Sequence, residues 1–137
     1  MTYLLDTNVI SEIRKPDPDA GVSDWFSETA SDELYLSVLV VGEIRQGIER
    51  LRRRRDRRQA NVFERWLNVL KDDFAARLLP ISAAIAERWG FLSATQPLPV
   101  IDGLLAATAI EHGLTFVTRD SGTFAGTGVP VLNPWQE

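Results

Sequence analysis

The chain has 137 residues, 45% of them hydrophobic, which is the length of one ordinary globular domain. It contains no cysteine, so disulfides, zinc–thiolate sites and a thiol nucleophile are excluded. The formal net charge of −4 does not by itself indicate nucleic-acid binding. Because there is one histidine, any metal site must be mostly oxygen-ligated, which favours Mg²⁺ or Mn²⁺ over zinc.

The N-terminus carries neither a positive n-region nor a long apolar h-region, and no run of about 18 apolar residues occurs. We therefore expect a cytoplasmic protein with no membrane association. The length and the lack of a linker or repeat predict a single domain over residues 1–137.

Short apolar runs bounded by polar residues predict five strands of a buried, mostly parallel sheet. These runs are Tyr3 to Leu5, Leu34 to Val38, Arg77 to Ile81, Thr115 to Thr118 and Val129 to Leu132. Helical patterns separate them, so the order of elements predicts an α/β/α sandwich. The last run contains a proline, which is tolerated in an edge strand.

Apolar residues at helical spacing predict six helices. Asp6, Thr7 and Asn8 could each cap the first helix, Pro99 opens the last one at a first-turn position, and Gly113 ends it. The residues that indicate the six helices include Val9, Ile10 and Ile13; Val22, Trp25 and Phe26; Val41, Ile44, Ile48 and Leu51; Val62, Phe63, Trp66, Leu67 and Leu70; Ile85, Trp89 and Leu92; and Leu104, Leu105 and Ile110.

Seven arginines form a basic block that contrasts with the acidic balance of the chain. They are Arg50, Arg52, Arg53, Arg54, Arg55, Arg57 and Arg58. The block is predicted to continue the polar face of the third helix.

Four acidic residues, far apart in sequence, lie near the ends of apolar stretches: Asp6, Glu43, Asp102 and Asp120. Parallel α/β folds build their sites where the carboxyl ends of the strands meet, so these side chains are predicted to converge. Four carboxylates repel one another unless a cation lies among them, and a divalent metal is the best candidate. Taken singly, each has an ordinary explanation as a helix cap, a solvated glutamate, a partner of a helix dipole or a turn residue.

The ordered motifs YLLDTNVISE (3–12), GEIRQG (42–47), DGLLAA (102–107) and TRD (118–120) resemble those of PIN-domain ribonucleases. The resemblance covers the whole chain and is specifically to the VapC and FitB toxins of bacterial toxin–antitoxin pairs. It implies a Mg²⁺- or Mn²⁺-dependent endoribonuclease that cuts transfer RNA or messenger RNA. It also implies a homodimer and an antitoxin that wraps the protein and often presents an arginine to the acidic pocket.

The resemblance implies that Asp6 and Asp102 are the central metal ligands, and that Glu43 and Asp120 bind directly or through water. Relatives often carry a further acidic residue before the phenylalanine, where this chain has Thr123, so Asp120 must complete the site. Thr7 and Thr118 could order a metal-bound water or a phosphate, or could simply cap backbone groups. Basic residues that could contact RNA are Arg14, Arg45, Arg52, Arg53 and Arg119.

Other interpretations remain open from the sequence. The basic block could aid solubility or bind an acidic partner. The protein could be a PIN nuclease of RNA processing, or an inactive RNA-binding module, in place of a toxin. A non-catalytic, metal-binding receiver-type signalling domain has a similar length, but it would need adjacent acidic residues after the first strand and a late lysine. A dehalogenase-like phosphatase would need a second aspartate where the chain has Asn8.

Overall fold

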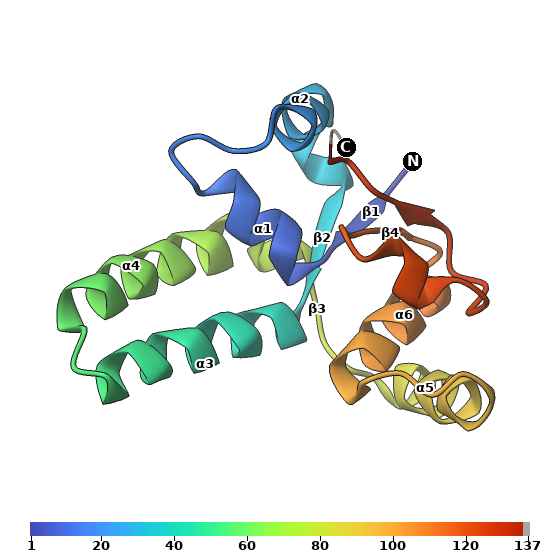
Figure 1. The fold of residues 1–137 in the computed structure, drawn as a ribbon. Helices are drawn as coiled ribbons and strands as arrows, with labels where there is room; N and C mark the ends of the chain where they lie inside the picture. The colour runs from blue at the N-terminus through green and yellow to red at the C-terminus, as the bar shows by residue number, and fades with distance from the viewer. Residues whose placement is uncertain (136–137) are drawn as a thin grey trace.

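The structure is a computed structural model that describes residues 1–135, within which five parallel strands form a sheet (Figure 1). The strands are β1 (Tyr3–Leu5), β2 (Leu34–Ser37), β3 (Leu78–Leu79), β4 (Thr115–Val117) and β5 (Val131–Leu132), in the spatial order β3-β2-β1-β4-β5. The predicted α/β class and five-stranded sheet are confirmed. Because β1 is the central strand, the residue that follows it lies in the middle of the edge where carboxyl ends meet.

Six α-helices connect the strands in the described part of the chain. They are α1 (Thr7–Ile13), α2 (Ala20–Glu28), α3 (Val38–Arg53), α4 (Arg57–Asp73), α5 (Ala83–Thr95) and α6 (Val100–His112), with short 3₁₀ turns at Ser31–Glu33, Ala75–Arg77 and Ser121–Phe124. In Figure 1 the pair α3 and α4 lies on one side of the strands and the pair α5 and α6 on the other. This is the predicted α/β/α sandwich.

Both edge strands are shorter than their apolar runs predicted. β3 ends at Leu79, directly before Pro80, and β5 begins directly after Pro130. Proline has no N–H to donate to a sheet, so these residues limit the pairing. At the end of β2, Val38 starts a helix because the Ser37 hydroxyl accepts a hydrogen bond from the Leu39 N–H at 3.0 Å.

Two details of the helix predictions were wrong. The basic block continues α3 only as far as Arg53: Arg54 is the C-cap of that helix, Arg55 adopts a left-handed conformation with φ 64°, and α4 begins at Arg57. Asp56 caps α4 by accepting from the Gln59 N–H at 3.3 Å, so the block forms the turn of a helical hairpin. Pro99 is the residue before α6 and not a first-turn residue.

The core is built around the central strand β1 and its neighbour β4, four of whose apolar side chains have no solvent exposure. Leu4, Leu5, Phe116 and Val117 are fully buried, and Phe124 packs edge-on against Phe116 with ring centroids 4.8 Å apart. This packing fixes the positions at which β1 and β4 end. Within residues 1–135, no helix combines the length and the apolar character needed to cross a bilayer.

A close contact between α5 and α6 fixes the start of α6. A Cβ atom added at Gly103 would lie 2.9 Å from Cδ1 of Trp89, so these helices approach too closely for any other residue at this position. Gly103 directly follows Asp102 and is buried. The packing of a tryptophan against glycine therefore sets where the Asp102 backbone lies.

We expect Gly103→Ala to lower the free energy of unfolding by about 1–3 kcal/mol, because the added methyl group overpacks the contact with Trp89. The matched control is Gly90→Ala in α5, where an added Cβ meets nothing within 4 Å. The control should be neutral or up to about 1 kcal/mol more stable, since alanine is the better helix former. Urea denaturation of both variants measures the difference, and equal effects would contradict the contact.

Candidate active site

The first predicted site residue, Asp6, lies at the end of the central strand and is 8% exposed. Its Oδ1 accepts a hydrogen bond from the Thr7 N–H at 2.7 Å, and its Oδ2 accepts one from the Thr118 hydroxyl at 2.7 Å. Asp6 is therefore the N-cap of α1, and neither Thr7 nor Asn8 takes that place. The same carboxylate is both a structural cap and a predicted site group.

The surroundings of Asp6 disfavour its charged form. The pKa of this carboxyl is raised from 3.8 to about 6. Burial is the largest cause, the hydrogen bonds from Thr118 and Thr7 lower the pKa, and the charges of Asp102 and Glu43 raise it by a smaller amount. A carboxyl that titrates this close to neutral pH is typical of functional sites.

Glu43 and Asp102 lie close enough to Asp6 to influence its charge. The Thr7 hydroxyl donates to Glu43 Oε1 at 2.5 Å, which holds this half-buried side chain of α3 against the start of α1. Asp102 lies in the first turn of α6, as predicted. Burial, followed by the charges of Glu43 and Asp120, raises the pKa of the Asp102 carboxyl. The four predicted carboxylates therefore lie close enough together for their charges to influence one another.

Asn8 connects the ends of β1 and β4, a role that its sequence position did not reveal. Its Nδ2 lies 3.4 Å from both Thr118 Oγ1 and Asp120 Oδ2, and its Oδ1 lies 3.5 Å from the Arg119 N–H. The Asp120 N–H also donates to Thr118 Oγ1, at 3.1 Å. Three polar residues in succession after a strand were the available signal, but they were read as alternative caps.

The chemistry of these donors suits a hard divalent cation. Among the ion pairs between described residues, none includes Asp6, Glu43, Asp102 or Asp120. In the arrangement found over residues 1–135, no three acidic side chains are near enough together to hold a metal. The side-chain oxygens would have to move closer together to enter one coordination shell. An all-oxygen set of ligands favours Mg²⁺ or Mn²⁺.

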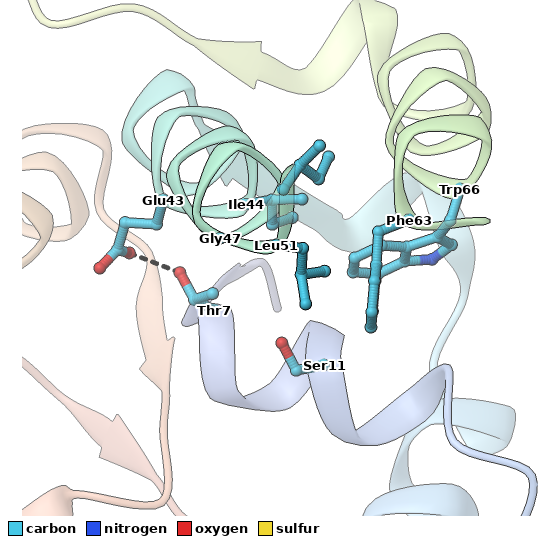
Figure 2. A pocket seen from close by; sticks show the side chains of 9 residues that line it. Thr7, Ser11, Glu43, Ile44, Gly47, Leu51, Phe63 and Trp66 are labelled. Carbon is cyan, nitrogen blue, oxygen red and sulfur yellow. Dashed lines mark hydrogen bonds between the residues drawn. The ribbon is translucent and has the colours of Figure 1, made fainter. Parts of the chain in front are cut away.

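A groove of about 250 Å³ opens beside this acidic cluster, between α1, α3 and α4 (Figure 2). At one end lie Thr7 and Glu43, joined by their hydrogen bond, and at the other lie Phe63 and Trp66. Ile44, Ile48 and Leu51 of α3 line the groove between them. An apolar groove that ends at a carboxylate can accept apolar side chains together with a polar or cationic group.

The predicted RNA-contact arginines differ in their surroundings. Arg45 and Arg52 both form ion pairs with Glu64, at 2.6 and 3.0 Å, and with Glu49. The Arg14 guanidinium lies 4.0 Å from the centroid of the Phe63 ring. Arg119 lies 5.3 Å from the Trp135 ring centroid, and Arg53 is exposed at the end of α3.

Comparison with known proteins assigns the chain to a family. The model of the PIN domain family matches residues 3–129, so the chain belongs to the PIN domain family. It is 36% identical over 140 residues to toxin FitB of Neisseria gonorrhoeae, covering 98% of this chain and 99% of that protein. It is 33% identical to VapC ribonuclease Y4jK of Sinorhizobium fredii, with 97% of each chain covered.

Solved structures agree with this assignment. The crystal structure of FitAcB from Neisseria gonorrhoeae superimposes with a TM-score of 0.89 at 35% identity, covering 99% of this chain and all of the other. A toxin–antitoxin complex from Klebsiella pneumoniae shares the fold with a TM-score of 0.76 at 22% identity, covering 99% and 100%. The receiver-type and dehalogenase-like alternatives are therefore wrong.

We expect Asp6→Asn to stabilise the metal-free protein above pH 6. The native carboxyl has a pKa of about 6, against 3.8 for the unfolded chain, so between these values the native state binds more protons. Wild-type stability consequently falls as pH rises through this window, by on the order of 2–3 kcal/mol from Asp6 alone. Thermal unfolding in EDTA should give similar midpoints near pH 4 and a higher midpoint for the variant at pH 7.5. A difference independent of pH would contradict the assignment.

We expect Thr118→Val to raise the pKa of Asp6 above its wild-type value, because the variant loses the hydroxyl that stabilises the charged carboxylate. Thr118→Ser keeps the hydroxyl and serves as the matched control. Carbon-13 NMR of the aspartate side-chain carboxyls in EDTA measures the pKa directly. If the two variants titrate alike, the hydrogen bond is not what holds the pKa down.

Proposed function

We propose that this protein is a Mg²⁺- or Mn²⁺-dependent endoribonuclease toxin that hydrolyses RNA phosphodiester bonds and is neutralised by a cognate antitoxin. The observation that carries the proposal is the cluster of Asp6, Glu43, Asp102 and Asp120, whose charges act on one another at the carboxyl edge of the sheet. Full-length similarity to toxin FitB and to VapC ribonuclease Y4jK supports it. These relatives favour a toxin over an RNA-processing nuclease.

In this proposal Asp6 and Asp102 are the central metal ligands, and Glu43 and Asp120 bind directly or through water. A bound Mg²⁺ or Mn²⁺ supplies a water-derived nucleophile and offsets the charge that develops on the leaving oxygen. The four carboxylate side chains must therefore be held so that their oxygens point toward the metal.

Three of the four proposed ligands have a hydrogen-bond partner that can orient them. The Thr118 hydroxyl orients Asp6, the Thr7 hydroxyl orients Glu43, and the Asn8 amide orients Asp120. Partners of this kind typically change metal affinity or activity by 10- to 100-fold. In this proposal Thr7 and Thr118 are therefore positioning residues that hold carboxylates. They do not contact the metal-bound water or the phosphate directly.

The same site suggests how an antitoxin would inhibit the enzyme. Apolar side chains of an antitoxin segment would fill the groove next to Phe63 and Trp66. A cationic group at the end of that segment would then face Glu43 and the other carboxylates. The proposed substrate is transfer RNA or messenger RNA, the proposed assembly is a homodimer, and the proposed location is the cytoplasm.

We expect the purified, antitoxin-free protein to cut a transfer RNA pool with Mg²⁺ or Mn²⁺ and to stop when EDTA is added. Asp6→Asn should lower cleavage by at least 100-fold while remaining folded, since it retains the cap acceptor for the Thr7 N–H. Asp17→Asn, an exposed aspartate outside the cluster, is the control and should cut like wild type. Metal-independent cutting, or cutting by Asp6→Asn at the wild-type rate, would refute the mechanism.

A further inference from the structure

The turn of the α3–α4 hairpin carries positive charge that no interaction within the described chain uses. Six arginines there are exposed and form no ion pair with another residue of 1–135: Arg50, Arg53, Arg54, Arg55, Arg57 and Arg58. On the same hairpin, Arg45 and Arg52 are neutralised by Glu49 and Glu64. The charge of the other six arginines is not neutralised in this way.

Local stability does not explain this charge. Arg57 and Arg58 occupy the first turn of α4, where the positive end of the helix dipole disfavours cations. Repulsion among neighbouring guanidinium groups adds to that cost. Among residues 50–58, Asp56, the N-cap of α4, is the single carboxylate against seven arginines. An anion bound at the turn would offset the positive charge that Asp56 leaves.

The positions along α3 connect this charge to the acidic cluster. Residues 43, 47, 50 and 54 are spaced by four, three and four, so they form one stripe along the helix. The stripe runs from Glu43 at the site to Arg50 and Arg54 at the turn, about 10 and 16 Å along the axis. Arg45 and Arg52 lie on the opposite edge, because residue 45 is about 200° around the helix from residue 43.

Gly47 lies on this stripe between the acidic and the basic ends. It is exposed, and an added Cβ would meet nothing within 4 Å, so packing does not require glycine there. A glycine inside a helix costs about 1 kcal/mol relative to alanine. Because Gly47 has no side chain, the surface of α3 between Glu43 and Arg50 is left open. A bound polymer could therefore lie along this part of the helix.

We propose that this stripe is a path for single-stranded RNA, in which Arg50 and Arg54 hold phosphates several nucleotides from the bond that is cut. The proposal rests on the ribonuclease function proposed above. A nucleic acid fits the turn better than a folded protein, because residues 50–59 contain a single apolar side chain, Leu51, and it is buried. Guanidinium groups on an exposed ridge match a chain of phosphates.

The test is the salt dependence of RNA binding, measured in EDTA so that no cleavage occurs. The probe is a fluorescein-labelled 20-nucleotide single-stranded RNA, and binding is followed by fluorescence anisotropy from about 50 to 300 mM KCl. The variants are Arg50→Gln/Arg54→Gln and the matched control Arg65→Gln/Lys71→Gln. The control removes the same charge from exposed positions of α4 that form no ion pair with another described residue.

We expect Arg50→Gln/Arg54→Gln to reduce the slope of log K against log salt by about 1.4, since each phosphate contact to a single strand contributes about 0.7. Affinity near 0.1 M salt should fall roughly 10- to 30-fold. The control should change the slope by much less. Equal slopes in the two variants, or no RNA binding by the wild type, would overturn the proposal.

Two further results separate the alternatives. Weaker binding of an antitoxin with unchanged RNA binding in Arg50→Gln/Arg54→Gln would overturn the RNA path and indicate a protein-binding surface. If the wild type binds RNA through these arginines but cuts nothing with Mn²⁺, the ribonuclease proposal fails and the RNA-binding path stands. The thermal midpoints of both variants should match that of wild type, because all four side chains are exposed.

Discussion

The hydrogen bond from the Thr118 hydroxyl to the Asp6 carboxylate joins the end of the central strand β1 to the end of its neighbour β4, and the arrangement of the acidic edge depends on it. Asp6 must stay buried to cap α1, yet burial disfavours its charge, so the protein needs a donor at the end of the neighbouring strand. The parallel pairing of β1 with β4 supplies this donor by aligning Leu5 with Val117, each one residue before the bonded pair. Strand register therefore has a direct electrostatic role in this fold.

The positions of the acidic residues after apolar runs were sufficient to predict the sheet edge on which they meet. Their hydrogen-bond partners were not predictable, because Thr7 bonds to Glu43 across 36 positions of sequence and the geometry depends on how α3 rotates against α1. The turn at Arg54 and Arg55 was missed for a different reason. Arginine is a good helix former, so the block itself gives no stop signal, and the evidence for a break was the capping aspartate, Asp56.

Stability and the acidic site make opposite demands on the same residues. Raised carboxyl pKa values at Asp6 and Asp102 mean that the metal-free fold carries a cost at neutral pH, which the core of β1 and β4 must offset. Some charges elsewhere are paired, as between Arg88 and Glu111, which join α5 to α6 at 2.8 Å. The sheet edge and the hairpin turn differ from these, because each gathers charges of one sign, negative at the edge and positive at the turn.

The prolines that shorten the outer strands also affect whether two molecules of the protein can associate through the edges of their sheets. A long exposed strand edge offers a row of free backbone groups on which a second chain can add, which leads to aggregation. Here β3 and β5, at the two margins of the sheet, are each two residues long and adjoin Pro80 and Pro130. The sheet therefore resists extension by strand addition. Little intermolecular β-structure is expected even where many copies of the protein are concentrated together. The same holds where several copies fold side by side during synthesis.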